Sequence, residues 1–378
     1  MPLCVLLHGD PRAPQQGRLG AALAARGHRV VVCDAPAVAA AIRGEHGAAC
    51  EEVTLLRRGP AALRRWWTRR VVRRLGVDVV HLNYIHWRHL LWATMDGGPS
   101  YVATAWGSDL NDEVFSKTPE QARAISAVLA GAAALTADSV PLLAKARARA
   151  GGARPAEIVL WGVDVGRFAP DRVHDRADAW RRELGLDAGV PVVLSPRQTL
   201  PHYHTDRILR AFAASRWAAR RGALVLKLHG KAQEQAYRAE LEALARELGV
   251  ARAIRFAPPC PYADLVGLYA AADVAVSAAE VDGVPSTFCE LLALGVPLIA
   301  PALAAYEGVL EHEARALLVP PADDAALVAA LDRLADDAAL RGVLAARGRV
   351  WAVEHADFER SVDRFEALYE LAVAGGPR

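Results

Sequence analysis

The stretch with the clearest chemistry runs from Asp282 to Glu290 and reads Asp-Gly-Val-Pro-Ser-Thr-Phe-Cys-Glu. A short apolar run precedes it and predicts a buried strand. Pro285 and Ser286 then open a predicted helix, with Ser286 as its N-cap. Gly295 ends that helix, and a second apolar strand follows. We therefore expect a loop at the carboxyl end of a parallel sheet, where ligands bind in α/β proteins.

The residue types in this loop suit a ligand that carries both phosphate and hydroxyl groups. Backbone N–H groups at the helix start, over residues 286–288, offer a phosphate site. Glu290 lies one turn into the helix on the same side. Its carboxylate would repel a phosphate but can accept hydrogen bonds from a diol such as ribose. Asp282 and Gly283 lie on the other side of the phosphate position, so the layout fits a nucleotide-sugar.

This stretch resembles the signature of the retaining glycosyltransferases of GT-B fold (glycosyltransferase group 1), which include glycogen and sucrose synthases and phosphatidylinositol mannosyltransferases. That family has two Glu residues separated by seven positions; here Asp282 replaces the first, and the spacing to Glu290 is kept. The resemblance implies that Asp282 contacts the donor sugar and that Glu290 binds the ribose. The donor-binding residues that it implies in this stretch are Gly283, Val284, Pro285, Ser286, Thr287 and Glu290.

The resemblance also implies the architecture, an α/β protein of GT-B fold with two Rossmann-like βαβ domains that face each other across a cleft. We expect an acceptor-binding domain over residues 1–168, a donor-binding domain over 169–355, and a C-terminal helix, 356–378, that packs back on the first domain. A chain of 378 residues is long enough for two domains. No G-x-G-x-x-G fingerprint follows either opening strand, which argues against a nicotinamide cofactor.

Arg197 follows the first predicted strand of the second domain, and the resemblance implies that it neutralises the donor diphosphate during catalysis. The family's lysine a few residues later is absent, because this chain has His202-Tyr203-His204 there. Either histidine could donate to the diphosphate, with a charge that depends on pH. Lys227 and Lys231, near the end of a later predicted strand, could also compensate; the alternative is that both are surface lysines.

In the first domain, the candidates for acceptor or sugar contact also follow predicted strands. His86 lies after one strand, and Trp106-Gly-Ser108-Asp109 lies after the next. Family members often have His-Gly-x-Asp at the second position, so the usual histidine is missing here. His86 either takes its role or is a structural histidine. We take His86 and Asp109 as candidate catalytic residues.

A loop over residues 8–17 is expected after the first strand, with a helix starting at Leu19. The resemblance implies a glycine-bearing donor-binding loop here, which makes Gly9 and Gly17 candidates. The alternative is a plain surface loop.

Residues 57–74 are rich in arginine and tryptophan and predict a helix from Ala61 to Leu75. One interpretation is a helix that packs one stripe, Leu63, Trp67, Val71 and Leu75, on the sheet. The other is a surface that contacts anionic lipid. The first half of the chain, residues 1–168, has 21 Lys and Arg against 14 Asp and Glu, which suits an anionic partner.

Composition narrows the class of protein further. The five cysteines form no C-x-x-C pair, so a disulfide framework or metal site is not expected and a reducing cytoplasm fits. No basic signal-peptide flank or membrane-spanning apolar run is present. We expect a cytoplasmic protein, either free or peripheral at the inner membrane face, with no nucleic-acid partner.

The expected function is transfer of a sugar from a nucleotide diphosphate-sugar to a hydroxyl of a glycan, lipid or small metabolite. The resemblance implies retention at the anomeric carbon and front-face departure, with no metal and no other cofactor. Two alternatives stay open: a nucleotide-sugar epimerase of the same fold, and a non-catalytic nucleotide-sugar-binding partner of another transferase.

Overall fold

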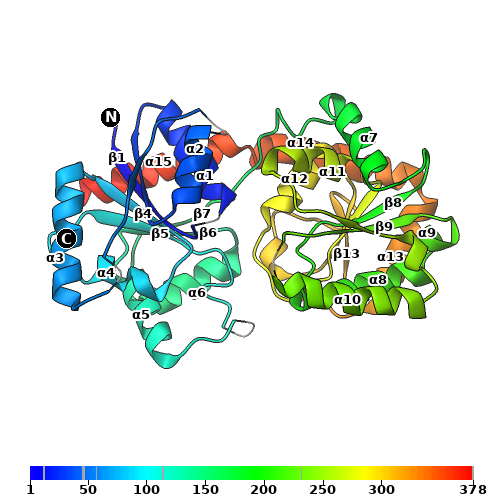
Figure 1. Cartoon of the computed structure of the whole chain (residues 1–378), viewed down its shortest axis with the longest axis horizontal. Helices are drawn as coiled ribbons and strands as arrows, with labels where there is room; N and C mark the ends of the chain where they lie inside the picture. The colour runs from blue at the N-terminus through cyan, green and yellow to red at the C-terminus, as the bar shows by residue number, and fades with distance from the viewer. Residues whose placement is uncertain (12, 45–46, 57, 113–114, 231, 377–378) are drawn as a thin grey trace. The chain divides into compact units, whose positions relative to one another are not determined.

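Two all-parallel β-sheets, one in each unit of the chain, organise the structure (Figure 1). The computed structural model describes residues 1–378 except 12, 45–46, 57, 113–114, 231 and 377–378. Unit 1 comprises Met1–Trp161 with Glu359–Arg378, and unit 2 comprises Gly162–Phe358. The expected α/β class with two Rossmann-like sheets is confirmed.

Unit 1 has the strand order β3-β2-β1-β4-β5-β6-β7. The chain starts in the middle of the sheet, builds outward to β3, and then returns to the other side of β1. The strands are β1 (Cys4–Gly9), β2 (Arg29–Cys33), β3 (Glu51–Val53), β4 (Val79–Asn83), β5 (Ser100–Thr104), β6 (Ala134–Ala137) and β7 (Ala156–Ile158). The α-helices are α1 (Pro14–Ala25), α2 (Pro36–Gly44), α3 (Ala61–Leu75), α4 (Leu90–Ala93), α5 (Pro119–Ala130), α6 (Val140–Ala150) and α15 (Phe358–Ala374).

Unit 2 repeats this plan with the strand order β10-β9-β8-β11-β12-β13. Its strands are β8 (Val192–Ser195), β9 (Ala223–Lys227), β10 (Ile254–Ala257), β11 (Val274–Val276), β12 (Leu298–Pro301) and β13 (Ala316–Val319). Its α-helices are α7 (His174–Glu183), α8 (Thr205–Ala214), α9 (Arg216–Ala219), α10 (Ala232–Glu247), α11 (Leu265–Ala270), α12 (Ser286–Leu294), α13 (Asp324–Asp336) and α14 (Ala338–His355). Three short 3-10 helices matter below: η1 (Trp87–His89), η3 (Pro201–Tyr203) and η6 (Ala304–Tyr306).

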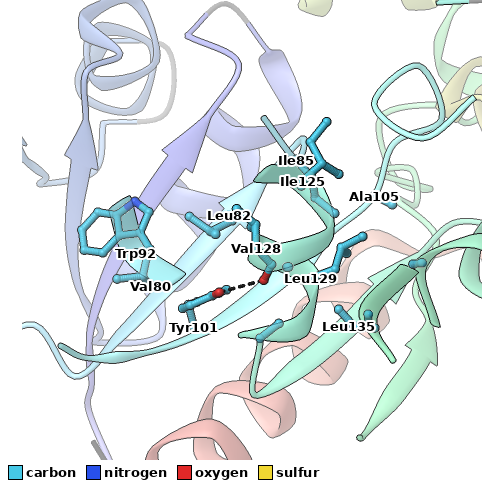
Figure 2. Packing of buried hydrophobic residues seen from close by; sticks show 14 of the residues in the cluster. Val80, Leu82, Ile85, Trp92, Tyr101, Ala105, Ile125, Val128, Leu129 and Leu135 are labelled. Atoms are coloured by element: carbon cyan, nitrogen blue, oxygen red, sulfur yellow. Dashed lines mark hydrogen bonds between the residues drawn. The ribbon is translucent and has the colours of Figure 1, made fainter. Parts of the chain in front are cut away.

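Helices cover both faces of each sheet, which explains the apolar character of the strands (Figure 1). Figure 2 shows the result in unit 1, where the side chains of β4 and β5 pack against those of α5. The hydroxyl of Tyr101 is buried there and donates to the carbonyl of Val128 at 2.7 Å. Both sheets therefore present only their strand ends to ligands.

The C-terminal helix α15 packs within unit 1. Arg26, which directly follows α1, pairs with Glu359 and Asp363, each at 2.6 Å. In the interior, His81 lies between the hydroxyls of Tyr369 and Thr104, at 2.6 Å from each. Burial lowers the pKa of His81 to about 3, so the imidazole is neutral in the folded chain. These contacts link the last helix to the central strands of unit 1.

The division between the units falls at Trp161/Gly162 and Phe358/Glu359, whereas the expected boundaries were residues 168 and 355. Within unit 2, the N–H of Val163 donates to the carbonyl of Ala356 at 2.7 Å. That bond holds the segment after residue 161 against the end of α14.

Two helix starts differ from the sequence-based expectation. Helix α1 begins at Pro14, so Gly17 lies inside a helix and not in a loop. Proline is well tolerated in a first helical turn, and the Gln16 side chain donates to the carbonyl of Asp10 at 2.9 Å. In α12, Pro285 occupies the N-cap without a side-chain bond, and Ser286 is the first helical residue.

Helix α3 has the predicted bounds but presents a different face to the sheet. Its buried residues are Thr68 and Val72. Of the predicted stripe, Val71 and Leu75 pack against the core, whereas the prediction is wrong for Leu63 and Trp67. Leu63, Trp66 and Trp67 are 47%, 57% and 37% exposed. The stripe was misplaced because alternating arginine and apolar pairs allow more than one helix face. Within the described residues, no helix is long and apolar enough to cross a membrane.

Candidate functional site

The carboxyl ends of β8, β9 and β11 lie side by side in unit 2, since β8 is flanked by β9 and β11. The chain leaves β8 toward one edge of the sheet and returns at β11 toward the other. The loops that follow these strands therefore diverge and leave room for a ligand. Arg197 follows β8, Lys227 ends β9, and the stretch from Asp282 to Glu290 follows β11.

Arg197 and Asp282 form a buried ion pair in this place. The Nη2 atom of Arg197 donates to Oδ1 of Asp282 at 2.9 Å, and the side chains are 13% and 12% exposed. Burial raises the pKa of the Asp282 carboxyl, while the charge of Arg197 opposes that rise. The Tyr306 hydroxyl, from η6, donates to Oδ2 at 3.2 Å. Sequence reasoning found the two charged residues but missed Tyr306, which lies in an apolar segment without a motif.

Helix α12 begins directly beyond this pair. The residues from Gly283 to Pro285 are buried, whereas Ser286 and Thr287 are half-buried at the helix start. The N–H of Gly283 donates to Asp282 at 3.1 Å, which fixes the turn before the helix. Glu290 is buried one turn further along. The first N–H groups of a helix have no intrahelical acceptor, so this position attracts anions.

The His202-Tyr203-His204 segment lies next to Arg197 through its tyrosine. The guanidinium carbon of Arg197 is 4.6 Å from the centre of the Tyr203 ring. The centres of the His202 and Tyr203 rings are 4.2 Å apart. His204 has a φ of 52° and places Nε2 3.7 Å from Oε1 of Glu280. Tyr203 is thus the residue of this segment that contacts Arg197, whereas His202 packs on Tyr203 and His204 faces Glu280.

Of the two lysines considered from the sequence, Lys227 is 5% exposed, so the surface-lysine alternative is wrong for it. Its Nζ lies 2.6 Å from Nε2 of His229. Burial lowers the pKa of Lys227 to about 8. Lys231 lies outside the described residues.

A hollow of about 650 Å³ lies at the carboxyl ends of β1, β2 and β4 in unit 1. It includes two predicted site residues, His86 and Gly9. A Cβ at Gly9 would lie 1.8 Å from the carbonyl oxygen of Asn83, so only glycine fits there. Gly17 does not line this hollow. The residues that sequence reasoning missed are His8, Asp10, Pro11, Asp34, Leu55, Leu56, Arg58, Arg64, Tyr84, Trp87, Arg88, His89 and Leu91.

Asp109, a candidate catalytic residue, is buried between the loops that follow β4 and β5. Its buried carboxylate accepts N–H bonds from Ile85, Trp106 and Gly107, at 2.9, 3.0 and 2.9 Å. Burial raises the pKa of Asp109 to about 6, although the backbone hydrogen bonds lower this pKa. Asp109 therefore joins the loops after β4 and β5 and positions His86.

One trio of possible metal ligands lies close together among the described residues. The ligand atoms of His8, Cys33 and Asp34 are within 4.8 Å of one another. However, Trp92 Nε1–H donates to Nδ1 of His8 at 2.9 Å, so the proton of a neutral imidazole is on Nε2. This tautomer has no lone pair at Nε2 with which to bind a metal ion. We therefore interpret His8 and Asp34 as lining residues of the hollow and not as metal ligands.

Known proteins resemble both parts of the chain. Residues 176–351, which lie within unit 2, match the family model of glycosyl transferases group 1. The D-inositol 3-phosphate glycosyltransferase of Thermomonospora curvata is 33% identical over 221 residues, which are 56% of this chain and 50% of that relative. The chain thus spans about half the length of this curated relative.

Solved structures resemble the whole chain. Sucrose-phosphate synthase from Thermosynechococcus elongatus is 22% identical, with a TM-score of 0.80 over 100% of both chains. Anabaena HepE, in complex with UDP and glucose, is 17% identical, with a TM-score of 0.81 over 97% of this chain and 99% of HepE. These likenesses confirm the predicted GT-B fold.

The position of Asp109 predicts a stability effect. In Asp109→Asn, one acceptor oxygen becomes an amide group that faces backbone N–H donors, and unsatisfied donors cost about 1–3 kcal/mol. We expect a lower melting temperature than in Asp96→Asn, where the carboxylate is exposed. Equal melting temperatures of these two variants, measured by calorimetry, would exclude the positioning role.

Proposed function

We propose that this chain is a glycosyltransferase that moves a sugar from a nucleoside diphosphate-sugar to an acceptor hydroxyl, with retention at the anomeric carbon and without a metal. The observation that supports this best is the grouping of Arg197, Asp282 and the start of α12 at the switch point of a group 1 domain. A buried cation and a helix N-terminus suit a diphosphate, and the carboxylates beside them suit sugar hydroxyls.

Each group has a distinct role in this proposal. The start of α12, from Gly283 to Thr287, binds the distal phosphate, and Glu290 accepts hydrogen bonds from the ribose. Asp282 contacts the transferred sugar. Arg197 stabilises the charge that develops on the leaving diphosphate, which accepts the proton of the attacking hydroxyl. Since HepE binds UDP and glucose, UDP is the first nucleotide to test.

We propose that the hollow of unit 1 binds the acceptor. His86 and Tyr84 offer hydrogen-bonding groups to hydroxyls, and Arg58, Arg64 and Arg88 favour an acceptor with an anionic group. A relative named as a D-inositol 3-phosphate glycosyltransferase is consistent with such an acceptor.

Two other functions remain as outcomes of the same assay. An epimerase would release an epimerised sugar without an acceptor. A non-catalytic partner would bind donors without turnover. The reason to consider it is that this chain has Asp at position 282 and lacks the family lysine. Product analysis by NMR with a panel of donors and acceptors separates these three, and it also reports the anomeric configuration.

Glu290→Gln tests the nucleotide site. The change replaces a ribose-facing carboxylate by a neutral amide, and a charge-assisted hydrogen bond contributes roughly 1.5–3 kcal/mol, so UDP affinity should fall about tenfold or more. Calorimetry measures it, with Glu240→Gln, an exposed position of α10, as the control. Unchanged affinity in a folded Glu290→Gln variant would remove this residue from the site.

We also propose that α3 contacts an anionic membrane surface. Residues 54–77 contain eight arginines and no acidic residue. Leu63, Trp66 and Trp67 are exposed on the same helix. Cationic and aromatic side chains together favour the boundary of an anionic bilayer. Since Arg64 also lines the hollow of unit 1, a lipid-borne acceptor is compatible with this surface.

Vesicle co-sedimentation tests this contact. The parent protein should sediment with phosphatidylglycerol vesicles and not with phosphatidylcholine alone, and added salt should weaken the binding. Trp66→Ala/Trp67→Ala should lose most of it. The matched control is Val350→Ala/Val353→Ala, two exposed positions of α14. Equal binding by both double variants, or none by the parent, would contradict the proposal.

A further inference from the structure

Lys227 is a buried cation that lacks a carboxylate partner. It is the last residue of β9 and is 5% exposed. Within the described residues, its ammonium contacts Nε2 of His229 at 2.6 Å and forms no ion pair. Burial of an unpaired charge is strongly unfavourable, so such groups are rare unless a ligand completes them.

The carboxylate of Glu234 orients His229 toward this ammonium. The Glu234 carboxylate, from α10, accepts the backbone N–H of His229 at 2.8 Å and lies 3.6 Å from its Nδ1. With the proton on Nδ1, the Nε2 lone pair accepts from Lys227. The geometry thus favours a charged Lys227 beside a neutral imidazole. The Glu290 and Glu234 carboxylates stabilise this charge from a distance, and neither forms an ion pair with it among the described residues.

Two further buried donors at the neighbouring strand ends lack an acceptor. Nε of Arg197, after β8, and Oγ of Ser277, after β11, have no hydrogen-bond partner among the described residues. Both strands lie next to each other in the sheet, and β9 lies beside β8. Arg197, Lys227 and Ser277 therefore place three incompletely satisfied donors at one edge. Buried donors without acceptors call for a ligand with several acceptor oxygens.

We infer that Lys227, Arg197 and Ser277 form an anion subsite for a phosphate of the nucleotide donor. This inference rests on the proposed function. Lys227 then supplies a second cation beside Arg197. The subsite lies on the strand ends that precede α12, so the helix N-terminus and the lysine approach the diphosphate from different elements.

The charged groups around Lys227 determine its pH behaviour. Burial lowers the pKa of Lys227 to about 8, Cys260, Glu290 and Glu234 oppose this, and Arg197 adds to it. Only the protonated amine attracts a phosphate. A terminal phosphate with a second pKa of about 6 is almost fully ionised at about pH 8, so the titration of UDP itself does not explain a loss of affinity above that pH. UDP affinity should therefore fall as pH rises above about 8.

The lowered pKa of Lys227 also makes the stability of the fold depend on pH. The ordinary lysine pKa is 10.5 and the folded value is about 8, so the unfolded chain binds more protons between them. The charge of Lys227 thus destabilises the ligand-free fold below that range, and stability increases as pH rises through it. Replacement by an apolar residue should raise the melting temperature of the ligand-free protein. A lysine retained only for the fold would show the opposite.

The experiment compares the parent, Lys227→Met, Lys227→Arg and a control, Arg252→Met, which removes one exposed positive charge of unit 2. Calorimetry measures affinity for UDP, pyrophosphate and uridine from pH 7 to about 9.5, a range that brackets a lowered lysine pKa. Lys227→Met should weaken UDP and pyrophosphate binding about tenfold or more. Uridine affinity should be unchanged, and the ligand-free protein should melt at a higher temperature.

Lys227→Arg should bind UDP with an affinity that is flat across this range, because arginine does not titrate there. A Lys227→Met or Lys227→Arg variant that follows the affinity and pH profile of the parent overturns the subsite and leaves the proposed function intact. A parent that binds neither UDP nor pyrophosphate overturns both.

Discussion

The ion pair between Arg197 and Asp282 is the interaction on which the site in unit 2 depends. Removal of one partner from such a buried pair leaves an uncompensated charge, which costs about 3–5 kcal/mol. Tyr306 and the N–H of Gly283 satisfy the remaining acceptor capacity of the carboxylate. The pair therefore fixes both the loop after β8 and the turn into α12 before any ligand arrives.

A diphosphate that enters this site competes with Asp282 for Arg197. The carboxylate can then turn to a neutral hydroxyl, which is the role proposed for it toward the donor sugar. Electrostatic balance also explains why further cations are useful here, because part of the charge of Arg197 is neutralised within the chain. The buried ammonium of Lys227 on the adjacent strand provides that charge, and it forms no ion pair with the described residues.

Local sequence patterns predicted the central strands and the loop at Asp282, whereas the position of the last helix was implied by the family resemblance. Apolar runs bounded by glycine and proline specify parallel strands, and these specify which loops share an edge. Tertiary contacts could not be predicted in the same way. Tyr306 meets Asp282 across 24 positions, and the carboxylate of Asp109 bonds backbone groups of a loop that carries no motif.

Burial was the second property that the sequence left open. Lys227 has the same charge whether it is exposed or buried, and only the packing of β9 shows that it is buried. In α3, paired arginines and tryptophans left the buried face undetermined, and the structure places Thr68 and Val72 there. Candidate site residues were thus predicted where a motif contains them and missed where only a contact in the fold brings them to the site.

Hydrogen–deuterium exchange with and without UDP tests the central claim, that unit 2 binds a nucleoside diphosphate at the start of α12. We expect slower exchange on UDP binding at residues 283–288, 196–203 and 228–230, at the carboxyl ends of β11, β8 and β9. Unchanged exchange in these three segments at saturating UDP, or protection confined to unit 1, would contradict it.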